Sequence, residues 1–207
     1  MKKLPLAAAA LAALLGFVGA APLALSQVAS QDPQSVKPGA YKVDPYHTQV
    51  TFSVSHFGFT EFSGFFSGAS GTLRLDPAKP SDSKLNVSIP VQSVATTVSK
   101  LDDELKGPQW LDPAQFPAAT FASTKITPTG RGAATITGNL TLHGVTRPIT
   151  LEAHMVGTGV NPLTKAVTVG FEASGTIKRS EFGVKTYVPL VGDDVRLTIA
   201  GAFELQP

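Results

Sequence analysis

Alternation between apolar and polar residues is the feature of this sequence that most restricts its fold. In one segment, Val50, Phe52 and Val54 alternate with Thr51 and Ser53. Successive side chains of a β-strand point to opposite faces, so such a segment is predicted to be a strand with one dry and one wet face. Buried parallel strands would instead be continuous apolar runs, so the pattern indicates an antiparallel sheet. The same alternation occurs over residues 85–91, 136–142, 149–155, 167–174 and 195–204.

Turn-forming residues separate the alternating segments at short intervals. Many short strands between closely spaced turns are typical of a β-sandwich or a β-barrel, and the alternation alone does not distinguish the two. The predicted breaks are at Asp76-Pro77, residues 129–132, His143-Gly144, residues 157–162 and residues 192–194.

One segment, from Ser99 to Lys106, departs from the two-residue period. Leu101 and Leu105 stand four residues apart, and Gly107 and a proline follow. With Ser99 as a candidate N-cap and Gly107 at C′, this spacing predicts a helix of two turns. A helix this short is not stable alone, so we expect it to pack on the sheet through Leu101, Leu105 and Trp110.

The first twenty residues differ in composition from the rest of the chain. Two lysines precede an almost unbroken apolar run that ends at Ala20. This order is typical of a secretory signal peptide, so we predict one over residues 1–20, with cleavage between about residues 20 and 30. Residues 27–39 are polar and contain prolines, so residues 21–39 are expected to form a flexible leader and residues 40–207 one barrel domain.

Composition argues against several classes of site. The chain has no cysteine, so disulfides, thiolate metal sites and a cysteine nucleophile are excluded. It has 17 Lys+Arg and 15 Asp+Glu, and loss of Lys2 and Lys3 with the signal peptide would leave it formally neutral. No basic run with interleaved aromatic residues occurs, so we expect no nucleic-acid partner. No common catalytic motif occurs either, so we expect no catalytic residues and no enzyme.

The histidines and phenylalanines are the side chains most open to interpretation. The spacings of His47, His56, His143 and His154 fit no short metal motif, so no metal site is expected. His56 is in phase with Phe52, which places it on the dry face, either as a hydrogen-bonded core residue or as a contact for a ligand head group. Six phenylalanines fall within residues 52–66, which indicates either a plugged core or a lumen that holds lipid.

Four longer stretches resemble the YceI-like family. The resemblance implies an all-β fold, an extended antiparallel lipocalin-like β-barrel with one short α-helix. It also implies an elongated channel for a polyisoprenoid, such as a prenyl quinone or prenyl phosphate, in an exported, periplasmic protein. The stretches occur in the family's order between about Tyr41 and Glu204 and read YKVDPYHTQVTFSVSHFGFTEFSGFFSGASGTLRLD, LDDELKGPQWLDPAQFPAATFAS, ITGNLTLHGVTRPITL and KRSEFGVK.

Two positions bear on how far the resemblance extends to the ligand. Many family members carry Arg-Asp where this chain has Leu101-Asp102, so any head-group contact of that arginine is lost here. Arg179 matches the family's Arg-Ser-x-Phe-Gly motif, and its planar guanidinium suits a carboxylate or phosphate. The alternative for Arg179 is a structural salt bridge, for example to Asp44 or Asp102.

We therefore predict a periplasmic carrier or reservoir that binds a long apolar lipid, without a cofactor. Its expected partners are an isoprenoid lipid or quinone and, transiently, a membrane. One alternative is an enzyme that acts on an isoprenoid or lipid-like substrate, and another is a small outer-membrane barrel, whose apolar face would point outward. The predicted ligand-binding residues, with both histidines and the arginine near a polar mouth, are His47, Phe52, Val54, His56, Leu105, Trp110, Phe121, Leu140, Leu142, Phe171 and Arg179.

Overall fold

The computed structural model describes residues 28–207, so the predicted signal peptide lies outside the described residues. The described chain contains one α-helix, α1 (Ser99–Leu105), and four short 3-10 helices. The 3-10 helices are η1 (Pro33–Ser35), η2 (Pro80–Asp82), η3 (Val91–Ser93) and η4 (Arg179–Phe182). The strands are β1 (Gly39–Val43), β2 (Gln49–His56), β3 (Thr60–Phe66), β4 (Ser70–Leu75), β5 (Lys84–Pro90), β6 (Ala118–Gly130), β7 (Ala133–Leu142), β8 (Val145–Val160), β9 (Val167–Lys178) and β10 (Val191–Leu205).

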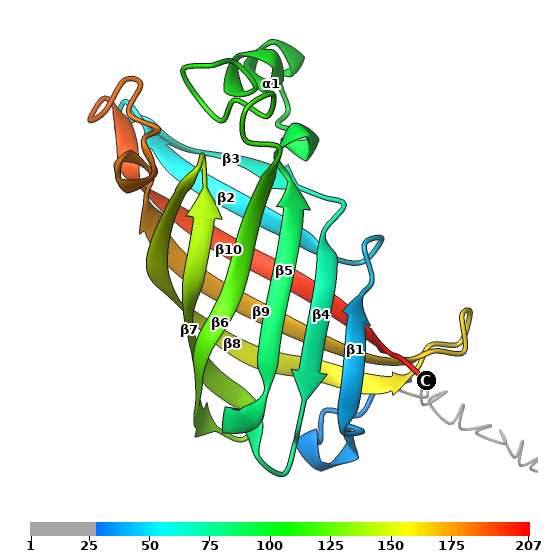
Figure 1. Cartoon of the computed structure of the whole chain (residues 1–207). Helices are drawn as coiled ribbons and strands as arrows, with labels where there is room; N and C mark the ends of the chain where they lie inside the picture. Colours follow the sequence, from blue (N-terminus) through cyan, green and yellow to red (C-terminus); the bar gives the residue numbers. More distant parts are fainter. Residues whose placement is uncertain (1–27) are drawn as a thin grey trace, which may run out of the picture.

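The strands form a closed antiparallel barrel (Figure 1). Strands β1 and β4 to β10 follow one another around a ring of eight, and pairing of β1 with β10 closes it. Strand β2 pairs with the remaining length of β10, and β3 pairs with β2. Each of the pairs β1/β2 and β3/β4 therefore acts as one barrel strand with a break in it. The predicted all-β antiparallel barrel with one short helix is confirmed.

A buried cluster lies at the end of the barrel where β1 and β10 meet. Tyr41 is fully buried there, and its hydroxyl donates a hydrogen bond of 2.6 Å to the carbonyl oxygen of Lys37. Burial raises the pKa of the Tyr41 hydroxyl. The cluster consists of Val36, Tyr41, Val43, Ala69, Leu73, Val169 and Phe203.

The expected flexible leader has to be corrected for residues 28–38, which pack against the same end of the barrel. Ser30 and Thr158 exchange two backbone hydrogen bonds of 2.8 Å, and Asp32 forms an ion pair of 2.8 Å with Arg131. Val36 is buried in the core cluster. Residues 21–27 lie outside the described residues. A polar composition did not reveal this packing because the partners of the leader are more than ninety residues away in sequence.

Two of the predicted breaks are instead parts of long strands. Residues 157–160 continue β8, and residues 192–194 continue β10, each next to a shift in pairing register. Gly159 has a packing reason for its lack of a side chain, since a Cβ there would lie 2.7 Å from the carbonyl oxygen of Val28. Gly157 and Gly159 of β8 thus leave room for the leader rather than end the strand.

Helix α1 covers most of the predicted segment but has a different N-cap. Val98 takes the N-cap position without a side-chain hydrogen bond, so Ser99 is the first helical residue. The carboxylate of Asp102 instead accepts hydrogen bonds from the backbone N–H and the hydroxyl of Thr96, at 2.7 and 2.6 Å. The helix lies beyond the end of the barrel rather than on an outer face of the sheet (Figure 1).

Because the leader packs on the barrel, the same substitution of valine by alanine is expected to change the free energy of unfolding differently at two leader positions. Val36→Ala removes buried methyl groups from the core cluster and should lower the free energy of unfolding by roughly 1–3 kcal/mol. Val28→Ala, on a residue that is 61% exposed, should change it by less than about 0.5 kcal/mol. Chemical denaturation measures both. Equal, negligible effects would mean that the leader does not pack in solution.

Candidate functional site

The lumen of the barrel contains two adjoining cavities, of about 250 Å³ and about 190 Å³. The larger, which we call the lower cavity, lies toward the leader, and the upper cavity lies toward α1. Five residues line both cavities, so the two spaces meet at one ring of side chains. This ring, the waist of the lumen, consists of Val50, Ile89, Phe121, Leu151 and Ile199.

Small residues on neighbouring strands explain why the lower cavity is not filled. Ala134 of β7 pairs with Ala153 of β8, which in turn pairs with Ala173 of β9, and all three line the cavity. The side chains of an eight-stranded barrel can fill its interior, so a row of methyl groups across three strands leaves space. The sequence interpretation missed these alanines, although Ala153 stands in phase with Leu151 in the alternation.

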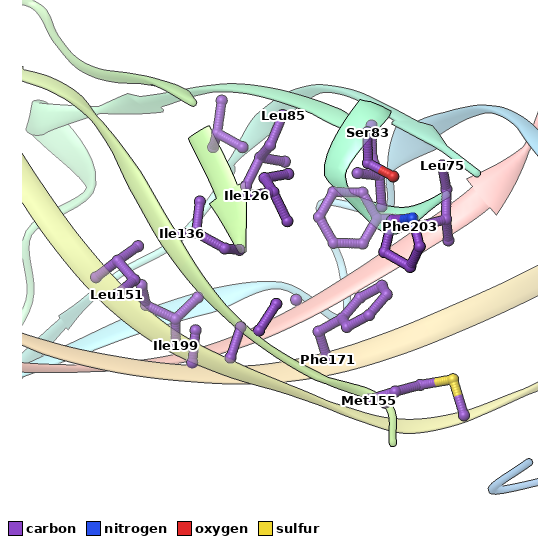
Figure 2. A pocket seen from close by; sticks show the side chains of 18 of the residues that line it. Leu75, Ser83, Leu85, Ile126, Ile136, Leu151, Met155, Phe171, Ile199 and Phe203 are labelled. Atoms are coloured by element: carbon purple, nitrogen blue, oxygen red, sulfur yellow. The ribbon is translucent and has the colours of Figure 1, made fainter. Parts of the chain in front are cut away.

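The remaining lining of the lower cavity is almost entirely aliphatic and aromatic (Figure 2). The rings of Phe171 and Phe203 stand edge to face at 6.0 Å, and Pro33 and Val36 of the leader complete the wall. Burial of apolar surface is the main gain available to a ligand in such a space. Figure 2 labels Leu75, Ser83, Leu85, Ile126, Ile136, Leu151, Met155, Phe171, Ile199 and Phe203 around it.

The upper cavity is bordered at one end by α1 and the turns after it. Leu105, Trp110 and Leu111 line the cavity from this segment, which we call the lid (residues 99–111). Two contacts hold the lid to the loop before β10: the Thr186 hydroxyl donates to the Gln109 carbonyl at 2.7 Å, and the rings of Trp110 and Tyr187 lie 6.2 Å apart. The lid is therefore part of the wall that a ligand in the upper cavity would contact.

Arg179 is the one charged side chain among the described residues that line the cavities. It is buried, and its guanidinium lies over the ring of Trp110, 5.4 Å from the centroid. Burial lowers the pKa of the Arg179 guanidinium, and the nearby Asp193 carboxylate opposes that shift. Cation–π contact with Trp110 links the arginine to the lid.

The hydrogen bonds of Arg179 tie together the chain around it. Its Nε, Nη1 and Nη2 donate to the carbonyl oxygens of Gly192, Val184 and Val191, at 2.8, 3.1 and 2.8 Å. Asp193 in turn accepts from the backbone N–H and hydroxyl of Ser180. The predicted alternative, a salt bridge to Asp44 or Asp102, is therefore wrong, because backbone carbonyls hold the guanidinium. This network joins η4 to the start of β10 under the lid.

Neither of the two predicted ligand-binding histidines lines a cavity. His47 is exposed, and its Nδ1 lies 2.6 Å from Oδ2 of Asp44. His56 is also exposed, because it is the last residue of β2 and lies at the rim of the barrel, packed against the ring of Phe57. It is therefore not the buried core histidine that the strand phase predicted.

The other nine predicted ligand-binding residues all lie on the lumen. Their role in binding stays a prediction, but their side chains come together as expected. Phe52, Val54, Leu105, Trp110, Leu140, Leu142 and Arg179 line the upper cavity, Phe121 lines both cavities, and Phe171 lines the lower one.

The strands turn their apolar faces inward. On β8, Leu151, Ala153 and Met155 line the lower cavity, while the intervening Glu152 and His154 are exposed. An outer-membrane barrel has the opposite arrangement, with apolar residues outward. Within residues 28–207, no three His, Asp or Glu side chains come close enough to hold a metal ion. No helix in this part of the chain is long and apolar enough to cross a membrane.

Comparison with known proteins places this architecture in one family. The model of the YceI-like domain matches residues 41–203. The protein YceI of Salmonella arizonae is 40% identical over 162 residues, which are 77% of this chain and 84% of that protein. The protein YceI of Salmonella heidelberg matches with the same identity and coverage.

Solved structures of the same shape come from three further bacteria. BcnA of Burkholderia cenocepacia is 27% identical with a TM-score of 0.70, over 77% of this chain and 98% of that one. A YceI protein of Campylobacter jejuni is 28% identical with a TM-score of 0.65, over 74% and 90%. A domain of Saccharophagus degradans, described as polyisoprenoid binding, is 14% identical with a TM-score of 0.58, over 82% and 100%, a likeness of fold alone.

The carbonyl contacts of Arg179 predict a large effect of a conservative change. Arg179→Lys replaces a planar fork by a single ammonium, so at least one buried carbonyl loses its donor, and the free energy of unfolding should fall by roughly 2–4 kcal/mol. Arg196→Lys, on an exposed position of β10, is the control and should change it by less than about 0.5 kcal/mol. Thermal or chemical unfolding distinguishes the two. An Arg179→Lys protein as stable as the control would show that the three carbonyls do not depend on the guanidinium.

Proposed function

The chain belongs to the YceI-like family, and on that premise we propose that it holds a polyisoprenoid chain in the barrel lumen as a periplasmic carrier or reservoir. The family and its polyisoprenoid-binding structural neighbour point to a binding protein rather than an enzyme. Among the described residues that line the lumen, the polar side chains are Thr48, Ser83 and Arg179, and each already has a hydrogen-bond partner.

The observation that carries the proposal is that two apolar cavities adjoin along the lumen and share the wall residues of the waist. Together they fall within the roughly 300–1,000 Å³ typical of small-molecule sites. A chain that occupies both cavities would run from the lid toward the leader past Val50, Phe121 and Ile199. Each buried methylene contributes roughly 0.8 kcal/mol before the costs of binding, so a long unbranched or methyl-branched chain suits this shape better than a compact ligand.

The electrostatics of the lumen favour a neutral head group, such as a prenyl quinone, over a prenyl phosphate. A buried phosphate carries up to two negative charges, whereas Arg179 is the one cation among the described residues that line the lumen, and three of its five N–H groups already donate to backbone carbonyls. An unpaired buried charge is strongly unfavourable. A quinone or alcohol carries no such cost and can lie in the upper cavity beside Trp110.

Periplasmic location is supported by the predicted signal peptide over residues 1–20, which would direct export. A carrier on the route between two membranes needs to shield an apolar chain from water, and the apolar walls of the lumen suit that task.

A pair of neighbouring substitutions on β9 tests where the chain lies. Ala173→Phe points into the lower cavity and should shorten the longest prenyl chain that binds, because each methylene kept out loses roughly 0.8 kcal/mol. Ser174→Phe adds the same ring on the exposed face and should change nothing. Binding of prenyl lipids of graded length, followed by fluorescence displacement or mass spectrometry, gives the answer. Unchanged binding of every length by a folded Ala173→Phe protein would contradict the proposal that the chain occupies the lower cavity.

A further inference from the structure

We propose that the barrel docks on a lipid bilayer through one defined surface, the apolar rim beside the lid. The apolar rim consists of Phe57, Phe59, Tyr187 and Leu190, from the β2–β3 turn and from the loop between η4 and β10. The inference rests on the proposed function for the identity of the cargo, but the docking contact itself can be tested without any cargo.

All four side chains of the apolar rim are exposed to solvent, and Phe59 most of all, at 86%. Large apolar residues gathered at an exposed surface usually mark a site of interaction. A hydrogen bond of 2.9 Å from the Phe57 N–H to the Leu190 carbonyl joins the two loops, so their tips present one surface. In Figure 1 both loops lie at the same end of the barrel as α1.

The backbone at two of these residues is held in an unfavourable conformation. Phe57 has φ 53° and Tyr187 has φ 60°, in the left-handed region that bulky side chains rarely adopt. Glycine would fit either turn without this cost, and Gly58 does so next to Phe57, with φ 72°. Strained backbone at exposed aromatic residues is typical of positions kept for function rather than for stability.

The apolar rim is directly connected to the lid. Tyr187 packs against Trp110, which lines the upper cavity, and Thr186 donates to the carbonyl of Gln109 in the lid. A surface that receives the tip of this loop therefore contacts the residues that border the upper cavity. Docking there would bring the lid to the place where a prenyl chain leaves or joins the membrane.

The chemistry of the loops favours a bilayer over a protein partner. Within residues 57–59 and 185–190, the only charged side chain is Lys185, so the tips of the two loops carry little charge that a membrane surface would have to desolvate. Aromatic side chains are favoured at the membrane–water interface. Four side chains at loop tips are also far fewer than the roughly 20–30 residues a side of a stable protein interface. A bilayer is moreover the place where an insoluble isoprenoid resides.

Vesicles of mixed phosphatidylethanolamine and phosphatidylglycerol test the proposal with the full mature chain. Phe59→Asp should lower partitioning onto these vesicles by at least about tenfold, since an apolar ring is replaced by a charge. Leu163→Asp is the matched control, because Leu163 is 89% exposed in the loop at the opposite end of β9 and should leave partitioning unchanged. Leu190→Asn, a milder change in the apolar rim, should weaken partitioning in the same direction.

The single tryptophan supplies a readout that is specific to this end of the barrel. Brominated acyl chains should quench Trp110 in the wild-type and Leu163→Asp proteins but much less in Phe59→Asp. The proposal would be overturned if the wild-type protein did not partition onto vesicles, which is the result expected if the apolar rim binds another protein instead. Equal losses of partitioning in Phe59→Asp and Leu163→Asp would overturn it as well. Partitioning by a wild-type protein that takes up no prenyl chain from detergent micelles would support the docking surface while refuting the proposed function.

Discussion

Three residue pairs between β1 and β10 turn an open antiparallel sheet into a tube, and the rest of the molecule depends on them. Tyr41 pairs with Leu205, Lys42 with Glu204 and Val43 with Phe203. Within the ring of eight, closure leaves no edge strand, so the backbone polar groups of β1 and β10 are paired where the two strands meet, whereas β3 lies outside the ring and pairs with β2. The inward side chains of the same strands belong to the buried cluster that forms the floor of the lumen. Closure and the floor of the site are thus one set of contacts.

The lumen remains partly empty because its inward residues are unequal in size. The alanine row across β7, β8 and β9 faces larger side chains such as Phe171, and the result is a long apolar space rather than a packed core. Its two ends differ. Pro33 and Val36 of the leader line the lower end, whereas a short lid held by a few contacts borders the upper end. Beside the lid, Arg179 organises the surrounding backbone.

Period-two alternation was enough to predict an antiparallel all-β fold, the phase of most strands and the inward position of residues such as Phe121 and Phe171, whereas the barrel itself was predicted from the family resemblance. The alternation could not show where a strand reaches the end of the barrel. His56 is therefore in phase with the inward residues of β2 but is exposed at the rim. The packed leader was missed because its pairing with Thr158 is long-range and carries no local pattern. The alanines of β7, β8 and β9 were not predicted to line the site, because large apolar residues are the usual walls of an apolar cavity. Here the small alanine side chains are what leave the lower cavity unfilled.

Mass spectrometry of protein purified from its native cells and freed of loosely bound lipid tests the central claim most directly. A lumen lined as this one is should retain a long polyisoprenoid with a neutral head group, close to one molecule per barrel. Recovery of no lipid, or only of compact polar molecules, would contradict a lumen built to hold an isoprenoid chain.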